Sequence, residues 1–315
     1  ADDARCLDQF AAGLAVATYE FENISLTTAR FLERRLAVHP SSLALETAQD
    51  RLFEKELFSR LGIPTARFAQ ISAPENFAAA LEVTGLPAIL KTRRLGYDGK
   101  GQMVVRTPEE LPEAWNALGG VPALLEGFVQ FDREVSILAV RSSTGETKFY
   151  PLVENTHRDG ILRLSRPQTP SLTAELQALA ETHASRVLDA LDYVGVLAIE
   201  FFQTGGTLVA NEMAPRVHNS GHWTIEGAET SQFENHLRAI LGMPLGSTAL
   251  RGHSAMVNLI GSMPERSSVL AIPGAHLHLY DKDPRPGRKL GHITLVADTP
   301  SLLDERLARI GPLVA

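Results

Sequence analysis

Two apolar segments on either side of a glycine pair constrain the fold of this chain more than any other feature. Tyr193–Phe202 and Thr207–Glu212 have the composition of β-strands, and Gly205-Gly206 between them is a strong hairpin signal. Glu200 shares a strand face with apolar residues, and so does Glu212. The segment therefore predicts an antiparallel hairpin with one glutamate on each strand.

The loop length determines how these two glutamates face each other. A three-residue loop, Gly205–Thr207, places Glu200 directly opposite Glu212. Like charges in directly opposed positions repel each other, and a cation between them removes the repulsion. Carboxylate oxygens suit Mg²⁺, which takes its remaining ligands from water and substrate phosphates. The hairpin thus predicts a magnesium site; the alternative is a register shift that turns one glutamate to solvent.

A basic, glycine-rich segment indicates a phosphate site. Arg93–Gln102 contains three glycines, which allow positive φ and a close approach of the backbone to an anion. The segment lacks the spacing of a P-loop, and the alternative is an ordinary basic hairpin turn. The glycines and the flanking cations are Gly96, Gly99, Gly101, Lys91, Arg93, Arg94 and Lys100.

Two further polar segments are candidates for ligand binding. His218 and His222 have the spacing of a zinc-binding helix, but Asn219-Ser220-Gly221 between them is poor helix material. A substrate-binding loop that carries Arg216 is the better interpretation. The Pro-rich loop Lys282–Lys289 places Arg and Lys together, which suits a terminal phosphate, unless it is a solvated turn.

The order of elements indicates a mixed α/β and α+β chain. Leu14–Thr18, a helix from Leu26 to Leu36 and Ala37-Val38 form half of an open α/β sheet, whose first strands we expect to be absent from this chain. Ser42–Leu61 reads as one helix and Thr147–Val153 as one strand. From position 255 onward short strands dominate.

Composition narrows the classes of partner. With 30 Lys plus Arg against 37 Asp plus Glu, the net charge of −7 argues against nucleic acid or anionic membrane as partner. Cys6 is the only cysteine of the 315 residues, which excludes an intrachain disulfide and fits a cytoplasmic protein. There is no apolar run of membrane-spanning length, and the N-terminus does not read as a signal peptide.

In this order, the segments resemble the ATP-grasp superfamily and, within it, the N5-carboxyaminoimidazole ribonucleotide synthetases of purine biosynthesis. The resemblance implies three domains: an incomplete pre-ATP-grasp α/β domain at 1–46, an ATP-grasp domain at 47–245 with a lid near 68–127, and a small β-rich domain at 246–315. The matching stretches, which span nearly the whole chain, are Tyr19–Asn23, Gly96–Gln102, Glu134–Ser136, Tyr150–Arg163, Tyr193–Val196, Asn211–Trp223 and Pro286–His292.

The resemblance also implies a reaction. ATP would phosphorylate bicarbonate to carboxyphosphate, which would carboxylate the exocyclic amine of 5-aminoimidazole ribonucleotide. The implied cofactors are ATP and Mg²⁺, or Mn²⁺ in its place, and the implied protein is a cytoplasmic homodimer. One alternative is a sister ligase such as formate-dependent glycinamide ribonucleotide transformylase; another is a nucleotide-binding module without catalysis.

Roles for individual residues follow from their positions in the family motifs. Lys100, Arg216 and Glu212 would be catalytic, and Glu200 and Glu212 would bind the metal. ATP would contact Arg51, Lys91, Gly96, Tyr97, Asp98, Gly99, Lys100, Gly101, Gln102, Glu126, Gly127, Phe128, Val129, Glu134, His157, Asn211 and Glu212. The ribonucleotide would contact Glu20, Glu22, Tyr97, Asp98, Lys100, Arg216, His218, Asn219, Lys282, Arg288 and Lys289.

The sequence also departs from the family pattern. The family usually begins with a strand and a Gly-rich turn that this chain lacks. Lys100 stands where Arg is common, which keeps the charge but loses the bidentate fork. Ala214 occupies the place where ATP-grasp proteins often carry Asn, and Asn211 precedes the metal glutamate instead.

Overall fold

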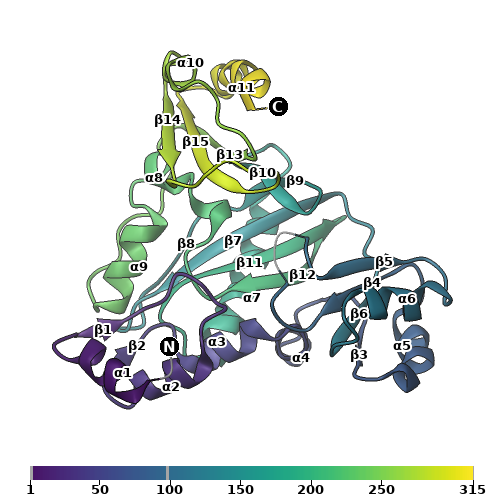
Figure 1. Ribbon diagram of the computed structural model, residues 1–315. Helices are drawn as coiled ribbons and strands as arrows, with labels where there is room; N and C mark the ends of the chain where they lie inside the picture. Colours follow the sequence, from purple (N-terminus) through teal and green to yellow (C-terminus); the bar gives the residue numbers. More distant parts are fainter. Residues whose placement is uncertain (1–2, 97–98, 315) are drawn as a thin grey trace.

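The N-terminal part is a small α/β unit at one end of the molecule. The computed structural model describes residues 3–96 and 99–314. Strands β1 (Val16–Ala17) and β2 (Ala37–Val38) pair in parallel, as the open-sheet interpretation requires. Three helices surround them: α1 (Ala4–Ala11), α2 (Leu26–Glu33) and α3 (Ser42–Gln49) (Figure 1).

The predicted single helix from Ser42 to Leu61 is wrong, because it is divided into α3 and α4 (Arg51–Arg60) at Asp50. The backbone of Asp50 is extended, with φ −122° and ψ 111°, and its carboxylate accepts a hydrogen bond from the Leu52 amide at 3.0 Å. An aspartate in this position caps the following helix. The break also leaves Asp50 free to pair with Arg93, where Nη2 and Oδ2 lie 2.6 Å apart.

A four-stranded sheet forms the predicted lid. Its strands β3 (Phe68–Ile71), β4 (Ala88–Thr92), β5 (Gln102–Val105) and β6 (Ala123–Gly127) have the order β3-β6-β4-β5. The helix α5 (Phe77–Thr84), which follows the short 3₁₀ turn η1 (Pro74–Asn76), and α6 (Glu110–Ala117) pack on one face over Leu90 and Leu125. Because side chains alternate along a strand, Ile89 and Lys91 face the other way.

The central sheet is antiparallel and continues into the C-terminal part. Its order is β12-β11-β7-β9-β10-β13-β15-β14, with β8 paired to β7. The strands are β7 (Arg133–Arg141), β8 (Thr147–Phe149), β9 (Val153–Arg158), β10 (Ile161–Pro167), β11 (Gly195–Thr204), β12 (Thr207–Ala214), β13 (His253–Ile260), β14 (Ala275–Leu279) and β15 (Lys289–Ala297). The predicted strand Thr147–Val153 is wrong: it is split into β8 and β9 around Pro151, which has no amide N–H to donate.

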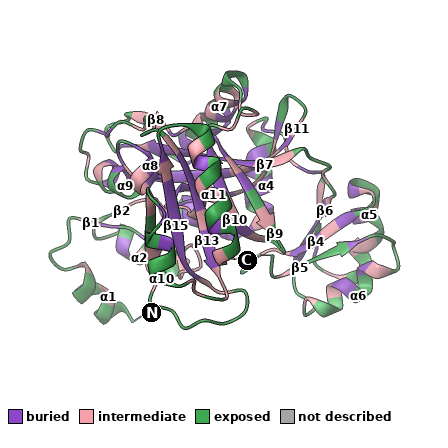
Figure 2. Cartoon of the chain, turned by 90° about the horizontal axis from the view of Figure 1, so that it is seen from above, coloured by how far each residue is buried: buried purple, intermediate pink, exposed green. Residues whose placement is uncertain are grey.

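Helices cover both faces of this sheet, so its strands are largely buried (Figure 2). Helix α7 (Ala174–Ala190) packs over Leu197 and Ile199, and α9 (Gln232–Ile240) lies with Val196 and Ala198 on the opposite face. The short η2 (Asn219–Gly221) and α8 (Thr224–Gly227) follow β12. Helices α10 (Arg266–Leu270) and α11 (Pro300–Val314) pack on the C-terminal strands. Among the residues at 3–96 and 99–314, none of these helices combines the length and apolar character needed to cross a bilayer.

Candidate active site

The cleft of the molecule consists of two adjoining cavities between the lid, the central sheet and the N-terminal part. The larger measures about 390 Å³, within the usual range for ligand pockets, and the smaller about 190 Å³. Six residues line both cavities: Arg51, Glu200, Glu212, His218, Asn219 and Lys289. The predicted carboxylate pair therefore stands where the two cavities meet.

The hairpin β11–β12 brings its glutamates together in a different way from the one we expected. The turn is shorter than predicted, because Thr204 pairs with Thr207 across Gly205-Gly206 alone. A bulge on β12 then inserts one extra residue, so that Phe201 faces Ala210 and Glu200 faces Glu212. The predicted pairing of the glutamates is confirmed. The extra residue is Asn211, which the bulge brings to the same cavity as Glu212.

The two carboxylates have different electrostatic environments. Burial, together with the charge of Glu212, raises the pKa of Glu200 to about 7. Desolvation opposes ionisation of Glu212 as well, but Arg51, with Nη1 3.0 Å from Oε2, holds the pKa of Glu212 below its usual range. One carboxylate is thus compensated by a cation of the protein, and the other is not fully compensated. Additional positive charge at this point would stabilise both in the ionised state.

A second cluster lies beside Glu200. Ligand atoms of Glu134, His157 and Glu200 all lie within 4.8 Å of one another, and His157 Nδ1 is 3.0 Å from Glu134 Oε2. Desolvation lowers the pKa of His157, but the hydrogen bond to Glu134 and the charge of Glu200 raise it above its usual value overall. Imidazole ligands suit Zn²⁺, whereas carboxylate oxygens suit Mg²⁺. Of the two groups, the Glu200–Glu212 pair has the ligand chemistry that fits Mg²⁺ better.

Lys91 reaches the larger cavity from β4, but its charge is also used inside the lid. Its Nζ lies 3.0 Å from Glu126 Oε2 and 3.4 Å from Asn211 Oδ1. Lys55, which sequence reasoning missed, places its own Nζ 3.4 Å from Glu126 Oε2. Burial opposes ionisation of Glu126, but the two lysines lower its pKa to about 2. The single charge of Glu126 is thus shared between two buried lysines beside the cavity, and burial lowers the pKa of Lys55.

The glycine-rich segment borders the cleft in part. Gly99 and Lys100 line the larger cavity, and Gly96 the smaller. Gly101 has a φ of 72°, and a Cβ there would come within 2.7 Å of Thr92 Oγ1, so this glycine is required. Tyr97 and Asp98 lie outside the described residues. Arg93 pairs with Asp50, and Arg94 donates to Gln49 Oε1 at 2.5 Å, so these flanking cations also hold the segment to α3 and α4.

The smaller cavity has polar walls from four parts of the chain. The Arg216 guanidinium forms an ion pair with Glu22, which ties the loop after β12 to the N-terminal unit. Asn219 and Asn258 exchange hydrogen bonds at 2.7 and 3.1 Å. Lys289 completes the wall from the start of β15. These predicted substrate residues are brought together.

Other predicted residues do not line either cavity in the part of the chain that the structure describes. Lys282 is exposed and lies 5.6 Å from the ring centroid of Tyr280, while Arg288 donates to the Asp283 carbonyl at 3.2 Å. For these two, the arrangement is that of a solvated turn. The other predicted residues outside the cavity walls are Glu20, Gly101, Glu126, Gly127, Phe128 and Val129.

Several residues of the cleft were missed from sequence. Phe131 stacks on Phe202 with ring centroids 4.6 Å apart, and both line the larger cavity with Ile89 and Leu162. The strand alternation that places Lys91 toward the cleft also places Ile89 there, so the position of Ile89 could have been predicted from the sequence. The contribution of Phe131 depends on the fold and has no local signal.

A lid sheet that closes over an antiparallel sheet with a carboxylate pair defines this chain as an ATP-grasp protein. Three domain models match it: the ribonucleotide synthetase preATP-grasp domain at 1–49, the ATP-grasp domain at 56–233 and the phosphoribosylaminoimidazole carboxylase C-terminal domain at 254–306. The predicted ATP-grasp fold, with its N-terminal and C-terminal domains, is confirmed.

The chain belongs to the N5-carboxyaminoimidazole ribonucleotide synthase family. It is 53% identical to the synthase of Pseudomonas aeruginosa over 99% of this chain and 86% of that protein. It is 42% identical to the Escherichia coli synthase over 95% of this chain and 83% of that protein. The structure of the Thermus thermophilus synthetase is similar with a TM-score of 0.95 at 61% identity, over 99% of this chain and 85% of that one. The structure of the Aspergillus clavatus synthase in complex with ADP and 5-aminoimidazole ribonucleotide is similar with a TM-score of 0.90 at 33% identity. This match covers 99% of this chain and 84% of that one.

Proposed function

We infer that this chain is an ATP-dependent ligase that carboxylates 5-aminoimidazole ribonucleotide to N5-carboxyaminoimidazole ribonucleotide in purine biosynthesis. The observation that carries the inference is the pair of adjoining cavities that share Glu200 and Glu212. A reaction that moves a phosphoryl group from one substrate to another needs two ligand sites that meet at a charged point. The cleft has this form.

ATP is assigned to the larger cavity. Its apolar wall, with Ile89, Phe131 and Phe202, suits the adenine ring, and its basic wall, with Lys91 and Arg51, suits the phosphates. The phosphates would then end near Glu200 and Glu212, at the junction.

Mg²⁺ is assigned to the same junction. Carboxylate oxygens of Glu200 and Glu212 and phosphate oxygens form the oxygen-only ligand set that Mg²⁺ prefers. The charge imbalance between the two glutamates supports this assignment, since a cation stabilises the ionised form of Glu200. When bound, the ion neutralises the charge that develops on the transferred phosphoryl group.

The ribonucleotide is assigned to the smaller cavity, and bicarbonate to the junction. In the first step, a bicarbonate oxygen bonds to the γ-phosphorus of ATP, and the bond to ADP breaks. In the second, the amine nitrogen of the ribonucleotide bonds to the carboxyl carbon, phosphate leaves, and the amine loses a proton. Arg51 and Lys91 would hold phosphate oxygens, while Arg216, Asn219 and Lys289 would orient the ribonucleotide.

Labelled bicarbonate tests the substrate assignment. With ¹³C-bicarbonate, ATP and 5-aminoimidazole ribonucleotide, we expect the label in a carbamate carbon, observed directly by ¹³C NMR. A sister ligase would instead transfer ¹³C-formate to glycinamide ribonucleotide. Label from formate, with none from bicarbonate, would contradict this proposal and support the sister ligase.

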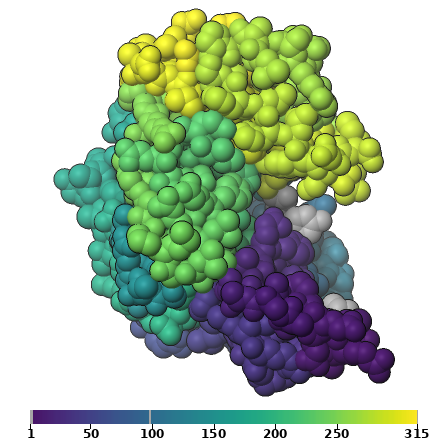
Figure 3. All heavy atoms as spheres, turned by 90° about the vertical axis from the view of Figure 1, so that its left-hand side faces the viewer, coloured from purple at the N-terminus to yellow at the C-terminus, as the bar shows by residue number. Residues whose placement is uncertain are grey.

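A homodimer is proposed from the outer surface of α9. Helix α9 lies on the side of the molecule that Figure 3 faces. Four apolar side chains at or near this helix are 36–53% exposed: Phe233, Leu237, Leu241 and Met243. Exposed apolar side chains gathered on one helix favour an interface, and a second copy is the partner we propose. We place the enzyme in the cytoplasm, where ATP and purine precursors are found and where the exposed thiol of Cys6 would stay reduced.

A further inference from the structure

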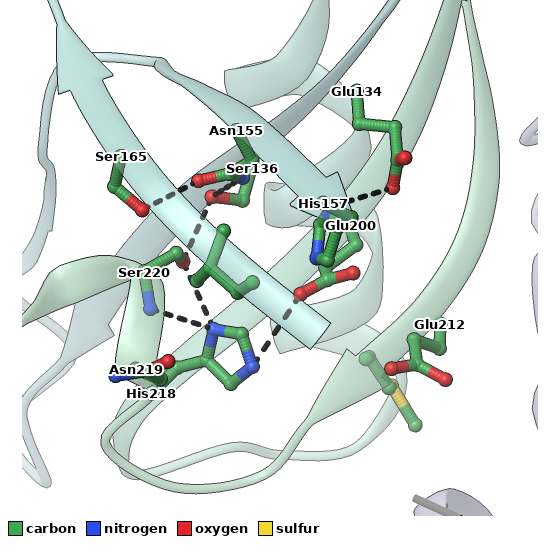
Figure 4. A network of polar contacts seen from close by, with 12 residues as sticks. Glu134, Ser136, Asn155, His157, Ser165, Glu200, Glu212, His218, Asn219 and Ser220 are labelled. Atoms are coloured by element: carbon green, nitrogen blue, oxygen red, sulfur yellow. Dashed lines mark hydrogen bonds and ion pairs between the residues drawn. The ribbon is translucent and has the colours of Figure 1, made fainter. Parts of the chain in front are cut away.

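A row of buried polar side chains ends at His218 and has no part in the reaction described above. Ser165 donates to Asn155 Oδ1 at 2.8 Å, and Asn155 Nδ2 donates to Ser136 Oγ at 2.9 Å. Ser136 Oγ lies 2.8 Å from Ser220 Oγ, which is 2.9 Å from His218 Nδ1 (Figure 4). The three serines are 0% exposed and Asn155 is 6% exposed. Buried polar groups of this kind, drawn from β10, β9, β7 and η2, are costly unless each finds a partner.

The backbone favours one direction for these hydrogen bonds. The Ser220 amide can only donate, and at 3.3 Å it forms a long hydrogen bond to His218 Nδ1, so it favours Nδ1 as the acceptor without fixing the tautomer alone. The Ser220 hydroxyl then donates to Nδ1 as well, because Ser136 donates to the Ser220 oxygen. Ser136 in turn accepts from Asn155. A flipped Asn155 amide would reverse these hydrogen bonds. Nδ1 would then have to donate to the Ser220 hydroxyl, and its proton would face the Ser220 amide N–H.

We propose that Ser165, Asn155, Ser136 and Ser220 are positioning residues that hold His218 as the neutral tautomer protonated at Nε2. This inference rests on the proposed function, because it assigns His218 a role in that reaction. His218 lines both cavities, and its Nε2 lies 3.5 Å from Glu200 Oε1. The fixed tautomer makes His218 a hydrogen-bond donor at the junction and excludes Nε2 as a general base.

The donor role matches the chemistry of the junction. When substrate is bound, an Nε2–H can donate to an anionic oxygen of bicarbonate or of the transferred carboxyl group. Without substrate, it can donate to Glu200. The opposite tautomer would present a lone pair to these oxygens and repel them. A histidine in the wrong tautomer loses its function even where its position is unchanged. The row of hydrogen-bonded side chains therefore affects turnover through His218, and its own members do not contact substrate.

Two measurements on the full chain test the proposal. With ¹⁵N-labelled histidine, long-range ¹H–¹⁵N spectra without substrate report which ring nitrogen of His218 carries the proton, and a His218→Asn variant assigns its signals. ADP release with the ribonucleotide and bicarbonate gives kcat and the KM for ATP. The variants are Ser136→Ala and Ser220→Ala, with Ser136→Thr as the conservative rescue. Ser254→Ala is the matched control, since the Ser254 hydroxyl is equally buried and makes no hydrogen bond with the described residues.

In the wild type we expect an Nε2–H tautomer. Ser136→Ala and Ser220→Ala should produce a mixture of tautomers and lower kcat about tenfold, the effect of one weakened hydrogen bond, with the KM for ATP unchanged. Ser136→Thr and Ser254→Ala should behave as the wild type.

An Nδ1–H tautomer in the wild type overturns the proposal. A change of tautomer without a change of kcat, or the reverse, overturns it too, because the two effects must occur together. If either Ser136→Ala or Ser220→Ala does not fold, the other alanine variant still tests the proposal. A wild type that releases no ADP with these substrates contradicts the proposed function instead, and the spectra then decide the tautomer alone.

Discussion

Replacement of Glu126 by glutamine should lower the free energy of unfolding by about 3 kcal/mol. The Glu126 carboxylate lies 3.0 Å from Lys91 Nζ and 3.4 Å from Lys55 Nζ, and the lysine side chains are 7% and 1% exposed. Burial opposes ionisation of Glu126, yet the lysines lower its pKa from the usual 4.5 to about 2. At about 1.4 kcal/mol per pH unit, this difference corresponds to roughly 3 kcal/mol. Removal of one partner from a buried ion pair typically costs about 3–5 kcal/mol, so the two arguments agree.

Urea-induced unfolding at pH 7 measures this effect. Trp115 lies on α6 of the lid, and Trp223 lies in the core of the central sheet, so tryptophan fluorescence reports on both regions. Glu56→Gln is the control, because Glu56 is exposed on the same helix as Lys55. We expect the control to differ from the wild type by no more than about 0.5 kcal/mol.

The pH dependence gives a second check of the same argument. A carboxylate whose pKa falls on folding contributes its full stabilisation above its unfolded pKa and loses it as the pH falls toward the folded value. The advantage of the wild type over Glu126→Gln should therefore narrow between about pH 4.5 and pH 2. If Glu126→Gln is as stable at pH 7 as Glu56→Gln, the charge of Glu126 does not stabilise the fold. A difference between Glu126→Gln and the wild type that stays constant down to pH 3 would have the same meaning.

Three further predictions concern the cleft and the outer surface. Glu212→Gln should lower ADP release about 100-fold or more, and Glu200→Gln should behave alike; near wild-type turnover would contradict their metal role. Lys91→Ala should weaken ATP binding about ten- to a hundredfold in calorimetric titration, whereas Lys289→Ala should leave it unchanged and raise the KM for the ribonucleotide. Equal weakening of ATP binding by both would contradict the division of the cleft. Leu237→Glu should convert a dimer to a monomer in sedimentation velocity, and a wild type that sediments as a monomer would contradict the proposed interface.

The central hairpin shows how far the sequence can predict this site. Alternation along the two strands, combined with a three-residue loop, predicted that Glu200 and Glu212 face each other, and the structure confirms this pairing. The reason for the register was wrong, because the turn is shorter and a bulge at Asn211 compensates for it. A bulge depends on the pairing of a strand with its neighbours and has no reliable signal in the strand itself.

The break at Asp50 and the ion pair of Glu126 were not predicted, for different reasons. The break at Asp50 had a local signal, since Asp is a preferred helix N-cap, but the apolar periodicity continued across it. The pairing of Glu126 with Lys55 had none, because the two residues are far apart in the sequence and meet only where the lid closes on α4. The same limit applies to the basic turn, where only the fold separates Lys289, at the cleft, from Lys282, in solvent.

ADP release with and without the two other substrates tests whether phosphoryl transfer and carboxylation are coupled. We expect the wild type to release ADP rapidly only when 5-aminoimidazole ribonucleotide and bicarbonate are both present, with one carbamate formed for each ADP. The junction of the two cavities at Glu200 and Glu212 requires this dependence, because phosphoryl transfer and carboxylation share one point. ADP release at the same rate without the ribonucleotide, or without formation of the carbamate, would contradict it.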